Sequence, residues 1–110
     1  MTVPLEITAS DVKQKIDDGA DFILLDVREP FEFEYCKIAG SYHVPMGEIP
    51  QRVDQWASWK DEPIVVVCHH GVRSLQVTHF LRSKGFGHSQ SLRDGIEGWS
   101  LTIDPNIPRY

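Results

Sequence analysis

The chain has 110 residues, a net charge of −5, and ordinary proportions of hydrophobic (41%) and charged (25%) residues. This size and composition predict one domain with its own core, and the acidic balance argues against a general nucleic-acid or anionic-membrane surface. No apolar run reaches the roughly 18–20 residues that span a bilayer, residues 1–5 lack a secretion signal, and two cysteines are too few for a disulfide scaffold. We therefore expect a cytoplasmic protein.

Strand-like and helix-like segments alternate along the chain. The predicted strands lie at Ile7 and its neighbours, 22–25, 42–44, 64–67 and 89–92, and the predicted helices at 9–18, 30–36, 49–57, 74–84 and 95–99. Alternation of helices with near-continuous apolar strands favours an α/β fold with a mainly parallel sheet. We expect a single domain over residues 1–110, with a core from about 5 to 100 and an extended tail over 102–110.

The most informative segment joins a buried strand to a helix through a short loop. Four β-branched residues at 64–67 predict a strand buried on both faces, and Cys68 follows at its carboxyl end. Ligands of parallel sheets bind outside these carboxyl ends. The N-terminus of the next helix, together with Arg73, favours a thiolate at Cys68 and attracts an anion to the same place. The segment therefore predicts a nucleophilic sulfur that attacks an anionic substrate.

Individual loop residues have expected roles. Gly71 permits close backbone approach or a positive φ, Arg73 supplies a charged, forked donor, and Ser74 is a natural residue to begin the helix. His69 and His70 are candidates for the mouth of the pocket. Adjacent Cys-His-His residues on one turn cannot all face one ion, and the sequence has no second cluster at zinc-like spacing, so we expect no metal site.

Three further residues are candidates for supporting roles. Asp26 and Arg28 follow the strand at 22–25, at the same sheet edge as Cys68, and we expect them to brace the rim of the site. Cys36 is either a resolving thiol for Cys68 or a core residue at a helix end, and we favour the core residue. Cys68 itself has the alternative of a small buried hydrophobe, which the glycine, arginine and serine of its loop oppose.

The order and spacing of four segments resemble the rhodanese (thiosulfate sulfurtransferase) family in its single-domain form. The similarity covers roughly residues 7–99 and rests on Leu25–Pro30, Ile38–Pro45, Cys68–Ser74 and Gly95–Trp99. The resemblance implies a rhodanese-like α/β fold, with a central five-stranded, mainly parallel sheet and helices on both faces. It also implies transfer of a sulfane sulfur from thiosulfate or a persulfide donor to cyanide or a thiol.

The resemblance assigns roles to the loop as well. Cys68 becomes the catalytic residue that carries the sulfur as a persulfide, with no metal or organic cofactor required. The small, sulfur-containing anion then lies against the loop residues, which are His69, His70, Gly71, Val72 and Arg73. Ser74, Asp26 and Arg28 keep their supporting roles.

Loop length separates this chemistry from a related one. Cys68 and Arg73 are spaced Cys-x4-Arg, whereas phosphatases and arsenate reductases that resemble this fold use Cys-x5-Arg, and the shorter loop suits one extra sulfur. A persulfide carrier or sensory module that serves a sulfur-relay partner and turns over little thiosulfate stays open. A purely structural binding domain is the weakest alternative. Lys37 and Asp94 depart from the family pattern, which often has histidine and glycine there.

Overall fold

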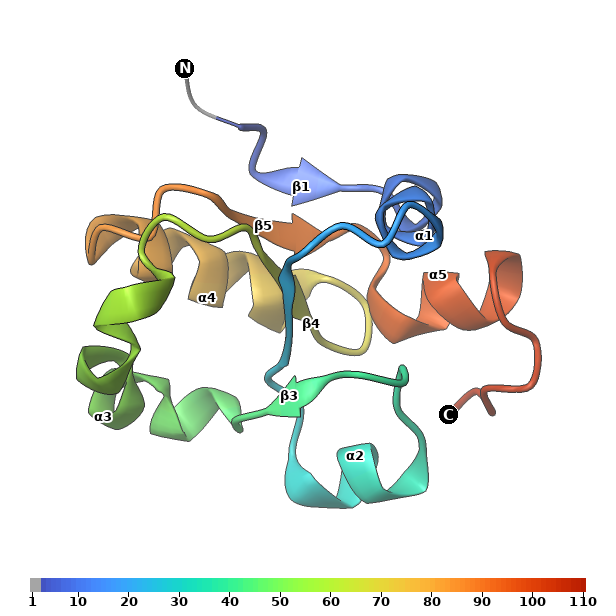
Figure 1. Ribbon diagram of the computed structural model, residues 1–110. Coiled ribbons are helices and arrows are strands. Elements are labelled where there is room, and N and C mark those ends of the chain that lie inside the picture. The colour runs from blue at the N-terminus through green and yellow to red at the C-terminus, as the bar shows by residue number, and fades with distance from the viewer. Residues whose placement is uncertain (1–2) are drawn as a thin grey trace.

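The computed structural model describes residues 3–110 and shows a parallel sheet with helices packed on both faces (Figure 1). The strands are β1 (Glu6–Ile7), β2 (Ile23–Asp26), β3 (Tyr42–His43), β4 (Ile64–Val67) and β5 (Ser89–Leu92), in the sheet order β1-β5-β4-β2-β3. Every pairing is parallel. The predicted fold class is confirmed. Residues 1–2, with which the expected domain begins, lie outside the described residues.

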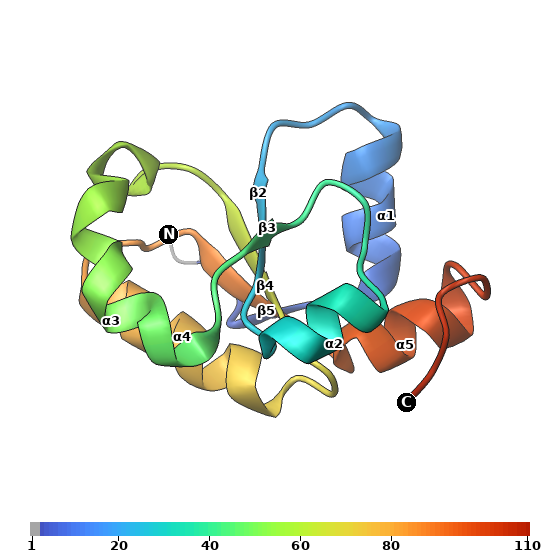
Figure 2. The same cartoon turned by 90° about the horizontal axis from the view of Figure 1, so that it is seen from below.

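The helices form a layer on each face of the sheet (Figures 1 and 2). Helices α1 (Ala9–Asp17) and α5 (Gly95–Thr102) cover one face, while α3 (Ile49–Arg52) and α4 (Val72–Ser83) cover the other. The short helix α2 (Pro30–Tyr35) follows the carboxyl end of β2. No helix within residues 3–110 combines the length and apolarity needed to cross a bilayer.

Strand β4 is the middle strand of the sheet and connects the two halves of the core. Ile64 and Val66 pack into the cluster beneath α3 and α4, whereas Val65 and Val67 pack into the cluster beneath α1 and α5. All four side chains are almost completely buried, as a run of β-branched residues in a parallel sheet predicts. The central position of β4 fixes the place where the next residue, Cys68, leaves the sheet.

The helix predicted over 49–57 is wrong in form. The structure has a 3-10 turn η1 (Met46–Glu48), the four-residue α3, and a 3-10 segment η2 (Val53–Trp59) that is kinked at Trp56 (φ −106°, ψ 24°). Side chains three residues apart eclipse in a 3-10 helix, and this stacks Trp56 on Trp59 with ring centroids 5.1 Å apart. The apolar stripe therefore identified buried residues but not the helix type.

The chain after Trp99 also differs from its predicted form. Helix α5 continues to Thr102, inside the segment predicted as a tail. The residues beyond it pack against the domain, because Ile107 is buried and its carbonyl accepts a hydrogen bond from Ser100 Oγ at 2.6 Å. Arg109 then pairs with Glu97 at 2.8 Å. The segment 103–110 is consequently attached to α5 at two places.

Candidate active site

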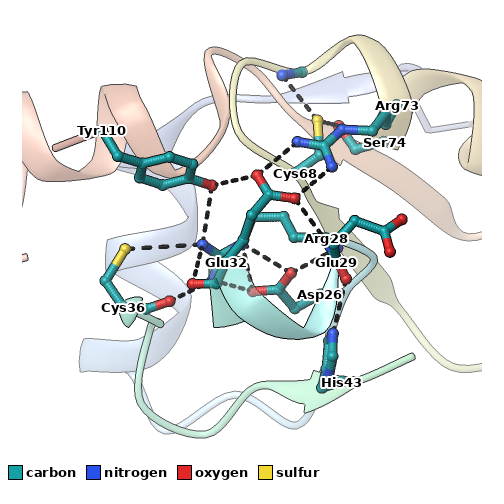
Figure 3. Close-up of polar contacts among 11 residues, drawn as sticks. Asp26, Arg28, Glu29, Glu32, Cys36, His43, Cys68, Arg73, Ser74 and Tyr110 are labelled. Carbon is teal, nitrogen blue, oxygen red and sulfur yellow. Dashed lines mark hydrogen bonds and ion pairs between the residues drawn. The ribbon is translucent and has the colours of Figure 1, made fainter. Parts of the chain in front are cut away.

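The side chain of Cys68 is buried at the carboxyl end of β4 and faces hydrogen-bonding groups (Figure 3). The backbone N–H of Gly71 donates to its Sγ at 3.0 Å, and Ser74 Oγ lies 3.3 Å from the same sulfur. Ser91 Oγ on β5 is 2.7 Å behind Ser74 Oγ. The sulfur thus sits at the start of a short row of buried hydroxyl groups.

The turn after Cys68 depends on Gly71, which caps α4. Its φ of 104° lies in the left-handed region that favours glycine. Ser74, expected to begin the helix, instead lies in its first turn, because the cap at Gly71 starts α4 at Val72. This shift turns the fully buried Ser74 hydroxyl toward the Cys68 sulfur rather than toward the helix N–H groups.

The N-terminus of α5 holds the other side of the turn. The N–H of Ile96 donates to the Cys68 carbonyl at 2.9 Å, and the N–H of Glu97 donates to the His69 carbonyl at 3.1 Å. A Cβ at Gly95 would overlap the His69 carbonyl and lie 2.6 Å from Cys68 O, so the two backbones meet without room for a side chain. Asp94 adopts φ 65°, a conformation that aspartate tolerates.

Arg73 forms a two-pronged ion pair with Glu32 of α2 (Figure 3). Its Nη1 and Nη2 lie 2.7 and 3.0 Å from the two carboxylate oxygens. Glu32 is buried and also accepts hydrogen bonds from the Glu29 N–H and the Tyr110 hydroxyl. The Arg73 hydrogen bonds outweigh burial and lower the pKa of Glu32 to about 2, and the same pairing raises the pKa of Arg73. Both groups are charged at neutral pH.

Asp26 and Arg28 are both fully buried and form a second ion pair beneath the first. Arg28 Nη2 lies 2.8 Å from Asp26 Oδ2 and donates to the Cys36 carbonyl at 2.6 Å. Its Nη1 donates to the Glu32 carbonyl and to the Tyr110 hydroxyl. Burial lowers the pKa of Arg28, but its bonds to Asp26 and Tyr110 outweigh burial, so its pKa is raised. Arg28 thereby joins the end of β2 to α2.

His69 and His70 stack on each other, with ring centroids 3.9 Å apart. The other face of His69 stacks on Tyr110 at 3.8 Å, with the planes within 9°. His69 Nε2 is buried without a hydrogen-bond partner, and burial followed by the neighbouring His70 lowers the pKa of His69, which keeps its ring neutral. His70 is exposed and borders a cavity of about 400 Å³ that Gly71 and Val72 also line.

Cys36 belongs to the core cluster beneath α1 and α5. Its sulfur lies 3.8 Å from Arg28 Nη1, and Figure 3 shows it on the opposite side of Arg28 from Cys68. This position favours the core residue over a resolving thiol. Within residues 3–110, no group of three or more His, Cys, Asp or Glu side chains is placed to hold a metal ion.

Sequence reasoning missed two residues of this cluster, Glu32 and Tyr110. Glu32 is one of 16 acidic residues, and its partner Arg73 lies 41 positions further along the chain. The only local signal for Glu32 is the predicted helix over 30–36, which places it on a turn after β2. Tyr110 lies in the predicted tail and carries no motif.

The fold and the loop define an α/β domain with a buried cysteine at the carboxyl end of its central strand, where the sulfur contacts a backbone N–H and a serine hydroxyl. Residues 8–102 match the rhodanese-like domain, and the chain therefore belongs to the rhodanese family. A solved rhodanese-related protein from Thermoplasma volcanium shares 30% identity and a TM-score of 0.78, with 96% of each chain covered.

Curated relatives carry sulfur-transfer names. A thiosulfate sulfurtransferase of Glaesserella parasuis is 32% identical over 79 residues, which cover 72% of this chain and 71% of that protein. An adenylyltransferase and sulfurtransferase of Zea mays is 31% identical over 109 residues, 94% of this chain. The match covers 23% of the maize protein, so the chain spans less than a quarter of that relative's length.

Proposed function

We propose that this protein is a cytoplasmic sulfurtransferase that moves a sulfane sulfur from thiosulfate or a persulfide donor to a thiophilic acceptor, through a persulfide on Cys68. The observation that carries the proposal is the position of the Cys68 sulfur at the N-terminus of α4, with the Gly71 N–H at 3.0 Å and the Ser74 hydroxyl at 3.3 Å. Membership of the rhodanese family supports the reaction class. The name of the Glaesserella parasuis relative supports thiosulfate as one donor.

The proposed reaction has two half-reactions that balance without an external oxidant. The Cys68 thiolate attacks the outer sulfur of thiosulfate, a new S–S bond forms, and sulfite leaves with the electron pair of the broken S–S bond. An acceptor such as cyanide then attacks the terminal sulfur of the Cys68 persulfide. Thiocyanate is released, and the Cys68 thiolate is regenerated.

The surroundings of Cys68 supply a physical reason for its reactivity. The Gly71 N–H and the N-terminus of α4 direct positive partial charge at the sulfur, where the proposed reaction places negative charge. With a thiolate present, the Ser74 hydroxyl donates to the sulfur, and Ser91 in turn donates to Ser74. The loop therefore stabilises negative charge before and after sulfur transfer.

A persulfide carrier that serves a protein partner is the second candidate function. It is favoured by two exposed apolar side chains, Phe31 and Val72, which expose 72% and 69% of their surface. Each is next in sequence to one member of the Glu32–Arg73 pair, so both lie near the site. A protein partner docked at the site would cover these two side chains.

Mass spectrometry of the full chain tests the proposed function. After thiosulfate exposure and removal of excess reagent, we expect one added sulfur atom, located on the Cys68 peptide. A Cys68 peptide that stays unmodified with thiosulfate and also with a low-molecular-weight persulfide would overturn the proposal. Transfer rates with thiosulfate, low-molecular-weight persulfides and a protein persulfide then separate the candidates, because a carrier uses the protein donor far faster than thiosulfate.

Arg73→Ala is expected to lower kcat/KM for thiosulfate by roughly ten- to a hundredfold relative to the wild type. Arg73→Lys is expected to lower it by less. The alanine variant leaves the buried Glu32 carboxylate without its two-pronged partner, whereas a lysine ammonium restores charge but not the fork. Steady-state kinetics with circular dichroism as a fold check measures this.

Arg52→Ala is the matched control for Arg73→Ala. Its side chain is 33% exposed against 32% for Arg73, and its contacts are a 3.6 Å surface pair with Glu48 and an exposed hydrogen bond to the Tyr42 hydroxyl at 3.0 Å. Surface pairs of this kind contribute little to stability, so its kinetics should match the wild type. If Arg73→Ala also has the kinetics of the wild type, Arg73 is only a surface charge with no role in catalysis.

A further inference from the structure

The segment after α5 brings a tyrosine to the candidate active site. Burial of Ile107 and the Arg109–Glu97 ion pair hold this segment against α5. Tyr110, the residue after Arg109, then lies beside α2 and the loop that follows β4 (Figure 3). It contacts three residues of the site or its support, which are Arg28, Glu32 and His69.

The Tyr110 hydroxyl lies between the two ion pairs. It donates to Glu32 Oε2 at 2.7 Å, and Arg28 Nη1 donates to it at 3.1 Å. Glu32 Oε2 is the oxygen that also accepts from Arg73 Nη2. Tyr110 and Arg73 therefore hold the same carboxylate oxygen from two directions, and loss of either donor removes one of the restraints on it.

The Tyr110 ring has a separate contact with the loop. It stacks on His69 at 3.8 Å, and its edge meets the Tyr35 ring at 5.9 Å. His69 Nε2 has no hydrogen-bond partner in the described structure. The main restraint on the His69 ring is therefore its position between the Tyr110 ring on one face and the His70 ring on the other. His69 directly follows the candidate nucleophile, Cys68.

We propose that Tyr110 is a positioning residue of the active site, which holds Arg73 through Glu32 and holds the loop through His69. The inference rests on the proposed function. Its chemistry requires a phenol that donates and a carboxylate that accepts, and the surroundings ensure both. Burial raises the pKa of Tyr110 to about 12, and Arg73 lowers the pKa of Glu32 to about 2.

The test compares Tyr110→Ala with Tyr110→Phe in the full chain. Alanine removes both contacts, whereas phenylalanine keeps the ring on His69 and removes only the hydroxyl. We expect kcat/KM for thiosulfate to fall about threefold in the phenylalanine variant, which loses the two hydrogen bonds of the hydroxyl, and about tenfold in the alanine variant, which also loses the stack on His69. Phenylalanine thus rescues part of the loss.

Tyr42 provides a matched control. It is 41% exposed against 42% for Tyr110, its hydroxyl also accepts from an arginine, and its ring contacts Trp59. Tyr42→Ala and Tyr42→Phe should leave kcat/KM close to the wild-type value. The proposal is overturned if Tyr110→Ala keeps wild-type kinetics, or if Tyr110→Ala and Tyr42→Ala lose the same share of kcat/KM. It is also overturned if the loss in Tyr110→Ala is no larger than the unfolded fraction measured by circular dichroism.

A spectroscopic measurement follows the geometry directly. Ring currents of Tyr110 shift the His69 ring protons, so NMR should show these signals displaced in Tyr110→Ala and retained in Tyr110→Phe. Unchanged His69 signals in Tyr110→Ala would contradict the stack.

Cys68→Ser separates the two proposals. Sulfur transfer that survives in Cys68→Ser defeats the proposed function, whereas wild-type kinetics in Tyr110→Ala defeat only the role of Tyr110.

Discussion

Cys68→Ser is expected to abolish sulfur transfer, by roughly three orders of magnitude or more, while leaving the fold intact. A serine hydroxyl does not accept a sulfane sulfur, yet it nearly matches the thiol in size. Its oxygen can use the Gly71 N–H and the Ser74 hydroxyl that now face the sulfur. Thiocyanate production from thiosulfate and cyanide measures the activity, and circular dichroism measures folding.

Cys36→Ser is the natural comparison, because Cys36 is the other cysteine of the chain and is also buried. We expect it to keep most of the activity, since its sulfur faces Arg28 and the core rather than the loop. A loss as large as that of Cys68→Ser would make Cys36 a participant in transfer.

Gly95→Ala is expected to damage both folding and catalysis. The added Cβ would overlap the His69 carbonyl, which is held by the Glu97 N–H, and Gly95 has a φ of 59° that side chains rarely adopt. Backbone cannot move aside as a flexible side chain does, so we expect a loss of roughly 3–5 kcal/mol in unfolding free energy. Displacement of Cys68 should also cost on the order of a hundredfold in rate. Urea unfolding and steady-state kinetics measure the two effects.

Gly19→Ala is the control that separates the steric overlap at Gly95 from the strain of a positive φ. Gly19 has a similar φ of 69°, but a Cβ there meets nothing within 4 Å. It should lose about 1–2 kcal/mol, the cost of a left-handed side chain, and keep its activity per folded molecule. Equal stabilities of the two variants would show that the α5 turn tolerates a side chain.

Local sequence signals predicted much of the fold. The β-branched run at 64–67 and the strand predicted at 89–92 match β4 and β5. The segment around Trp56 was predicted as a regular helix from the spacing of its apolar residues. This spacing indicates which face of the segment is buried. It does not report the helix type, and the segment forms a kinked 3-10 helix in which Trp56 stacks on Trp59.

The candidate site divides in the same way. The turn from Cys68 to Arg73 is contiguous in sequence, so its cysteine, glycine and arginine were visible together. Glu32 and Tyr110 reach the site only through the tertiary fold, from 41 and 37 positions away from Arg73 respectively (73 − 32 and 110 − 73). The sequence therefore predicted the charge of Arg73 but not that its guanidinium would pair with Glu32.

The all-parallel sheet also bears on how the chain reaches this structure. No strand pairs with its neighbour through a tight hairpin, and β1 pairs with β5 from opposite ends of the described chain. Loop closure must therefore precede nearly every strand pairing, which is typical of slowly folding proteins. The carbonyls of Cys68 and His69 find their partners only when α5 docks. The turn that presents the sulfur is therefore completed late, and the reactivity that depends on this turn arises only after the two ends of the described chain have come together.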